Sequence, residues 1–125
     1  MIWPARIVGA LTASYGLAVA IAPRVLAGPC DLTESDGSIS ASTKSLCRAI
    51  GVRDIASGAA MMTAAQGAPL KAATAIRVSA DIGDAVGLGL SLPSAEARKK
   101  AAVVAGSWAV VTAVAGALAR RPSKD

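Results

Sequence analysis

Five charged residues lie within otherwise apolar stretches of this chain, and they are the candidates for chemistry. Arg53 and Asp54 are adjacent in one stretch, and Arg77, Asp81 and Asp84 follow in another. Spacings of four and seven residues put the last three on one face of a helix. Three carboxylates against two guanidinium groups leave one carboxylate without a formal counterion. The five residues therefore form either a structural charge network or a binding site.

Two interpretations of this set stay open. In the structural one, Arg77 pairs with Asp81 in its own helix or with Asp54 across an interface, and Arg53 pairs with Asp84, while the remaining Asp keeps its proton. In the functional one, the spare carboxylate lines a small wet cavity as a general acid, proton carrier or cation site. Asp81 and Asp84 are then the catalytic candidates, with Arg53 or Arg77 orienting an oxygen of the substrate.

Composition excludes several other chemistries. The chain has no His and only two Cys among 125 residues, which rules out the common zinc sites and the Ser-His-Asp and Cys-His arrangements. We therefore expect no metal and no cofactor. Charged residues make up 17%, well below the roughly 25% of an ordinary soluble domain, and 54% are hydrophobic. The net charge of +5 suits anionic headgroups, and without an aromatic-rich basic patch no nucleic-acid partner is expected.

The outer segments of the chain are the most apolar. Ala101–Ala119 holds 19 residues without a charge, enough to cross a hydrocarbon core of about 30 Å at about 1.5 Å per residue. Ile2–Ala27, uncharged from Ile7 to Pro23, predicts a second span. Its Ala-x-Ala sequences also suit a signal peptide, but one Arg makes a poor basic n-region, which favours a retained span. The alternative for both segments is a buried helix of a soluble bundle.

The charged residues lie on two weaker helices between these spans. A charge at the centre of a membrane helix costs about 2.5–3.5 kcal/mol, so these helices insert only if their charges face protein or water and are paired. We therefore predict an all-α, four-helix antiparallel transmembrane bundle, multi-pass in the inner or plasma membrane, in which the outer segments screen the charged ones. The chain is one membrane domain, 1–125, with helices at about 4–27, 49–65, 71–91 and 95–120 and a polar loop at 28–48.

Small and capping residues predict where helices touch and begin. Gly51 and Gly58 are one heptad apart on the second helix, and Gly83 and Gly87 are four residues apart on the third. Such spacings allow close packing of helices in lipid. Ser94 is placed to cap the last helix.

Cys30 and Cys47 lie near the two ends of the polar loop. A disulfide between them would close a loop of 18 residues, worth about 3 kcal/mol in the chain-entropy model, and would require an oxidising compartment. The alternative is two unpaired thiols near a membrane surface. A four-span bundle would have five basic residues on one side of the membrane and six on the other. This difference is too small for the positive-inside rule to set the orientation.

One short motif carries a resemblance to a known family. The pattern Gly51-x-Arg53-Asp54-x-x-x-Gly58, with Asp84 on the next helix, resembles a family of small four-span bacterial membrane proteins abundant in actinobacteria. The function of that family is unknown. The resemblance implies a four-helix membrane bundle in which these five residues are the matching positions. It implies no activity, substrate or cofactor.

For function, the leading hypothesis is a non-catalytic membrane protein. It would be an accessory subunit, or a binder of a lipid or apolar small molecule organised by the Arg/Asp network. The alternatives are a small membrane enzyme that uses Asp81 or Asp84 as an acid on an apolar substrate, and a component of a proton- or cation-coupled carrier. The partners expected are membrane lipids, an apolar ligand, and further copies of the chain or a larger membrane complex.

Overall fold

The computed structural model describes residues 1–119, and within this range the chain is helical with no strand. The prediction of an all-α fold is confirmed, although there are five helices rather than four. They are α1 (Trp3–Ile21), α2 (Arg24–Ala27), α3 (Ala41–Thr63), α4 (Ala68–Ser91) and α5 (Ala95–Ala119). The expected end of the last helix at residue 120 lies outside the described residues.

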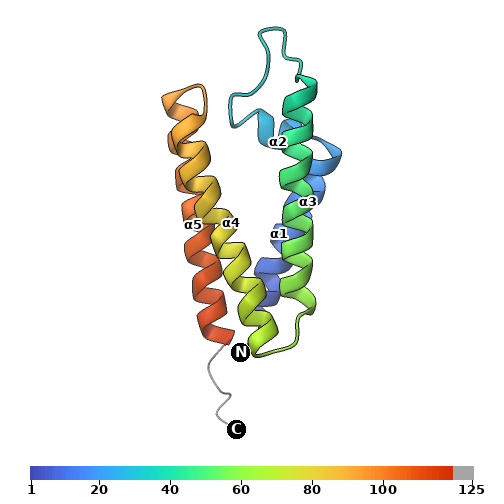
Figure 1. Ribbon diagram of the computed structural model, residues 1–125, viewed down its shortest axis with the longest axis vertical. Coiled ribbons are helices and arrows are strands. Elements are labelled where there is room, and N and C mark those ends of the chain that lie inside the picture. The colour runs from blue at the N-terminus through green and yellow to red at the C-terminus, as the bar shows by residue number, and fades with distance from the viewer. Residues whose placement is uncertain (120–125) are drawn as a thin grey trace.

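The four long helices form two pairs in an elongated bundle (Figure 1). α1 packs chiefly against α3, and α4 packs chiefly against α5. The seams between the pairs, α1 with α5 and α3 with α4, are much less extensive. The one-turn helix α2 lies at the same end of the bundle as the turn between α4 and α5 (Figure 1). The molecule is therefore two tight helix pairs joined along looser seams.

The first helix is interrupted near its expected end. A single helix at 4–27 was predicted, but α1 ends at Ile21 and the chain resumes as α2 after Pro23. The backbone of Ala22 leaves the helical region, with φ −126° and ψ 85°. Proline disfavours helical geometry in the residue before it, which explains the break. The prediction of one continuous helix is corrected accordingly.

The loop that follows is shorter than predicted, because α3 begins at Ala41 rather than 49. Ser40 Oγ accepts a hydrogen bond from the backbone N–H of Thr43 at 3.2 Å, which caps the helix. The polar first turns of α3 resembled loop sequence, but they are the solvated start of a long helix. The expected cap of the last helix is confirmed, since Ser94 Oγ accepts from the N–H of Ala97 at 3.1 Å.

Glycines bring the backbones of α1 and α3 into direct contact. Gly9 lies against Gly58, and Gly16 lies against Gly51, so the two helices run antiparallel. A Cβ built on Gly16 would lie 2.5 Å from the carbonyl oxygen of Gly51, and one on Gly58 would lie 2.5 Å from that of Gly9. No side chain fits at these distances. The predicted contact through Gly51 and Gly58 is confirmed, and its partners are two glycines of α1 with the same spacing.

Large apolar side chains cover the outer surface of all four long helices. Leu90 is 78% exposed and Ile21 is 72% exposed, and the same holds on the charged helices for Val52 and Ile76. Gly83 and Gly87 also face outward, and a Cβ built on either would meet no atom of another described helix within 4 Å, so their predicted role in helix contact within this chain is wrong. By length and composition, two helices, α1 and α5, are able to span a membrane.

The apolar core gathers toward the two ends of the bundle. One cluster joins the start of α1 to the ends of α3 and α5, and two others join α2 and the loop to the opposite end. Their largest members include Val8, Met61, Leu70, Val19 and Leu92. The middle of the bundle is left to polar side chains.

Candidate functional site

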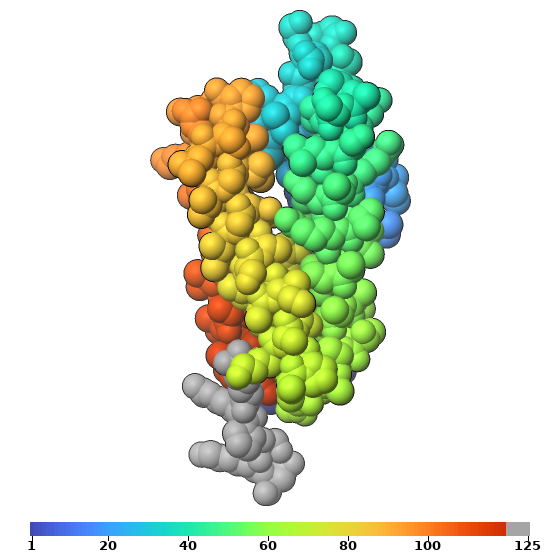
Figure 2. Space-filling view, in the orientation of Figure 1, coloured from blue at the N-terminus to red at the C-terminus, as the bar shows by residue number. Residues whose placement is uncertain are grey.

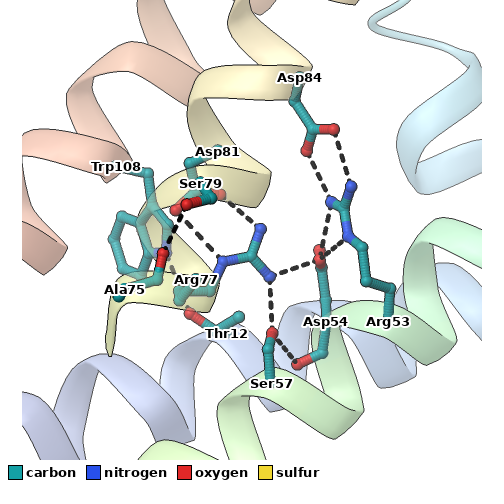
Figure 3. A network of polar contacts seen from close by, with 10 residues as sticks. All are labelled: Thr12, Arg53, Asp54, Ser57, Ala75, Arg77, Ser79, Asp81, Asp84 and Trp108. Atoms are coloured by element: carbon teal, nitrogen blue, oxygen red, sulfur yellow. Dashed lines mark hydrogen bonds and ion pairs between the residues drawn. The ribbon is translucent and has the colours of Figure 1, made fainter. Parts of the chain in front are cut away.

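Arg77 of α4 lies at the centre of the polar interior and is only 1% exposed. Its Nη1 donates to Asp54 Oδ1 of α3 at 2.6 Å and to Ser57 Oγ at 2.8 Å. Its Nη2 and Nε donate to the two oxygens of Asp81 at 2.5 and 3.2 Å, within the same helix (Figure 3). Arg77 thus holds α3 and α4 together while all three of its nitrogens donate.

Arg53 of α3 completes the network from the other side. It forms a two-point pair with Asp84 of α4, with Nη1–Oδ1 at 2.8 Å and Nη2–Oδ2 at 2.6 Å. Parallel bonds of this kind are the strongest arrangement of Arg with a carboxylate. Its Nη2 and Nε also donate to Asp54 Oδ1 at 2.9 and 3.2 Å. Asp54 therefore lies between two guanidinium groups, and the α3–α4 seam is joined by ion pairs.

The structure brings all five charged residues singled out in the sequence into one network (Figure 3). Asp81 pairs with Arg77 and Asp84 pairs with Arg53, so the two aspartates do not form an isolated carboxylate pair. Sequence reasoning did not assign Ser57 to the network. Its place one turn after Asp54 was the available signal.

The distribution of bonds over the three carboxylates is uneven. Both oxygens of Asp81 and both oxygens of Asp84 accept a hydrogen bond from a guanidinium group. Asp54 accepts all of its bonds on Oδ1, and no donor among residues 1–119 reaches its Oδ2. Asp54 is only 5% exposed. One oxygen of the Asp54 carboxylate therefore retains its full capacity to accept hydrogen bonds.

A cavity of about 460 Å³ opens between the two helix pairs beside this network. All five helices contribute to its wall, and the space-filling view shows the molecule hollowed between α3 and α4 (Figure 2). Most of the wall is apolar, including Leu11, Leu26, Ile50, Leu88 and Val104. Asp54, Arg77, Asp81, Asp84 and Lys100 form its charged part. The cavity thus combines an apolar space with one ionic wall.

Trp108 of α5 and Thr12 of α1 close another part of the wall. The indole N–H of Trp108 donates to Thr12 Oγ1 at 3.0 Å, which links the two helix pairs on the side away from the ion pairs. Tyr15 lines the cavity one turn further along α1. Sequence reasoning did not assign these residues to the site. A Trp inside an uncharged helix was the signal, because its N–H needs an acceptor once it is buried.

Cys30 and Cys47 are both buried and unbonded. Cys30 lines the cavity, and Cys47 packs in a separate apolar cluster with Val19 and Ala27. The disulfide considered from the sequence is therefore absent from the structure. Burial raises the pKa of the Cys30 thiol, which keeps it protonated and poorly nucleophilic at neutral pH.

The described residues contain no cluster of His, Cys, Asp and Glu suited to a metal ion. Among the hydroxyls beside the network, Ser57 already accepts from Arg77 and contacts the backbone oxygen of Asp54. The arrangement offers a fixed ionic wall, an open acceptor and an apolar space. This combination is chemically suited to holding a molecule.

Comparison of the chain with models of protein families gives no match, and no curated protein or solved structure matches it either. The resemblance to the small four-span bacterial family therefore stays a prediction.

Proposed function

We propose that this protein is an integral membrane protein whose four long helices each span the bilayer and whose cavity binds an apolar small molecule or a lipid chain. The observation that carries the proposal is the distribution of side chains, which is the reverse of that in a soluble protein. The five charges lie in the middle of the bundle, and large apolar side chains cover its outside. Large exposed apolar surfaces on a helical protein mark sites of contact with a membrane or another protein.

The lengths of the charged helices support four spans. α4 has 24 residues and is about 36 Å long, more than the roughly 30 Å of a hydrocarbon core, and the 23 residues of α3 include its solvated first turns, so a shorter part of α3 would lie in the hydrocarbon. Their charges are compatible with this depth because they face the interior and are paired. Val52 on α3 and Ile82 on α4 face outward, where lipid would contact them.

The cavity supports a binding role. Its volume of about 460 Å³ lies in the range of about 300–1,000 Å³ typical of small-molecule sites, which are mostly apolar with a few polar groups. A catalytic role for Asp81 or Asp84 has less support, because both oxygens of each carboxylate are engaged by a guanidinium group. We therefore favour binding over acid–base catalysis.

Labelling of single cysteines tests the four-span topology. In a Cys30→Ser, Cys47→Ser background, Glu34→Cys and Glu96→Cys should react with a membrane-impermeant maleimide from one side, and Gln66→Cys only from the other. These positions lie in the loop before α3, at the start of α5 and in the turn between α3 and α4. Labelling of Gln66→Cys from the same side as the other two would contradict four spans.

Fluorescence of Trp108 tests the cavity as the binding site. The chain has two Trp, so a Trp3→Phe background leaves Trp108 as the only reporter. Neutral 1-adamantanol should shift its emission saturably, and Ala105→Phe, which fills the cavity, should weaken that binding at least about tenfold. Ala113→Phe, on the exposed face of the same helix, is the matched control. Equal binding by the two variants would contradict the proposed site.

A further inference from the structure

We propose that the cavity selects an apolar amine, a ligand whose protonated amino group binds the open oxygen of Asp54 and whose hydrocarbon body fills the space between the helix pairs. This inference rests on the proposed binding function and specifies the chemistry of the ligand. It follows from which hydrogen-bonding groups of the wall are used and which are free.

Most N–H groups of the two arginines already donate within the network. Each nitrogen of Arg53 and Arg77 donates to a carboxylate or to Ser57 Oγ. Each guanidinium has five N–H groups and uses four of them, so a carboxylate or phosphate ligand would find one N–H on each arginine and would add a negative charge beside three others. Burying a further unpaired negative charge is strongly unfavourable. The wall is therefore poorly suited to an anion.

The larger free capacity lies on the acceptor side. Asp54 lines the cavity, is 5% exposed, and receives no hydrogen bond at Oδ2 from the part of the chain that the structure describes. A carboxylate oxygen accepts two hydrogen bonds, so this oxygen has room for a donor in the cavity. A donor from the ligand would satisfy it. An ammonium N–H provides such a donor with a positive charge.

The charge balance of the network points the same way. Two arginines face three aspartates, so the ionised network carries one negative charge in surplus. A monovalent cation in the cavity would neutralise it without breaking any existing pair. Lys100 also contributes to the wall, but it is exposed, so the surroundings screen its charge from the buried carboxylates.

Two aromatic rings strengthen the preference for a cation. Tyr15 and Trp108 both line the cavity, and the faces of such rings attract ammonium groups. An apolar body with one ammonium group therefore matches the cavity in shape, charge and hydrogen bonding.

Three probes with the same body test the inference: 1-adamantylamine, 1-adamantanol and 1-adamantanecarboxylate at pH 7, measured by Trp108 emission in the Trp3→Phe protein. A charge-assisted hydrogen bond predicts that the amine binds about tenfold to a hundredfold more tightly than the alcohol. The carboxylate should bind most weakly. Equal or tighter binding of the alcohol or the carboxylate would overturn the inference and leave the proposed binding function standing. Failure of all three probes to bind would overturn both.

Two variants locate the recognition. Asp54→Asn removes the proposed partner, and Asp84→Asn removes the surplus charge while leaving Asp54 Oδ2 untouched. Both should reduce the preference for amine over alcohol, measured as the ratio of the two dissociation constants in the same variant, about tenfold. Glu34→Gln removes one negative charge from the exposed loop and should keep the full preference. If Asp54→Asn fails to fold, Asp84→Asn alone tests the inference. An undiminished preference for the amine over the alcohol in Asp84→Asn would overturn it.

Discussion

Arg77 ties the carboxylate of Asp54 on α3 to that of Asp81 on its own helix, with almost no exposed surface. The net contribution of a buried ion pair is small, because desolvation of the charges offsets their attraction. Removing one partner is different, since the other charge is then left buried and unpaired. The consequence of losing an arginine should therefore depend on how deeply it lies.

Arg77→Gln should destabilise the protein by about 3–5 kcal/mol, because it leaves Asp54 and Asp81 without their buried counterion. Arg53→Gln should cost clearly less, since the side chain of Arg53 is 35% exposed and its loss leaves Asp84 in contact with the surroundings. Unfolding of the purified protein in detergent measures both values. A greater loss of unfolding free energy for Arg53→Gln than for Arg77→Gln would contradict the proposed dependence on burial.

The thiols provide a second prediction. Under nonreducing conditions the intact mass should show both Cys30 and Cys47 reduced. Cys30 should react slowly with a small maleimide at pH 7, because it is buried and its pKa is raised, and faster as rising pH forms the thiolate. The rate of mass increase measures this. Rapid labelling of Cys30 at pH 7, as fast as in the unfolded protein, would contradict it.

At the scale of elements, α1 and α3 depend on their glycines. Gly16→Ala should destabilise the protein by several kcal/mol, because its methyl group would lie 2.5 Å from a backbone oxygen and force the two helices apart. Gly83→Ala is the matched control on an open face, and alanine is about 1 kcal/mol better than glycine inside a helix. Thermal unfolding should therefore show a lower Tm for Gly16→Ala and a higher Tm for Gly83→Ala than for the unmodified protein. Equal destabilisation by both would mean that the described contact does not determine stability.

Local periodicity explains how much of the arrangement could be predicted. Spacing along one helix placed Arg77, Asp81 and Asp84 on a shared face, because helical geometry repeats whatever the surroundings. The spacing of Gly9 and Gly16 was equally visible in the sequence. It gains meaning only when α3 is known to be the neighbour, so the pairing of α1 with α3 depends on tertiary packing.

Boundaries and the cavity were harder to predict, for different reasons. The polar start of α3 has the composition of a loop, and only the cap at Ser40 indicates a helix there. The cavity has no local signature, because Tyr15 and Trp108 become part of one wall only after both helix pairs have assembled. Its existence depends on how the pairs meet, which no single segment encodes.

For the whole molecule, the apolar outer surface predicts how the backbone is protected in a bilayer. In lipid nanodiscs, amide hydrogen exchange should be slow over 50–62 and 72–90, because these parts of α3 and α4 would lie within the hydrocarbon region. The loop at 31–40 should exchange rapidly. Mass spectrometry of peptides measures both rates. Exchange in α3 as rapid as in the loop would contradict its placement in the membrane.

The two tight helix pairs, α1 with α3 and α4 with α5, also bear on biosynthesis. α3 follows α1 along the chain, so the glycine contact can place Arg53 in the bilayer before α4 is made. When α4 arrives, Asp84 meets Arg53, and Arg77 meets Asp54. We expect the charges of α3 to act as a template that lowers the cost of inserting α4. The ion pairs would then serve the nascent chain before they serve the folded protein.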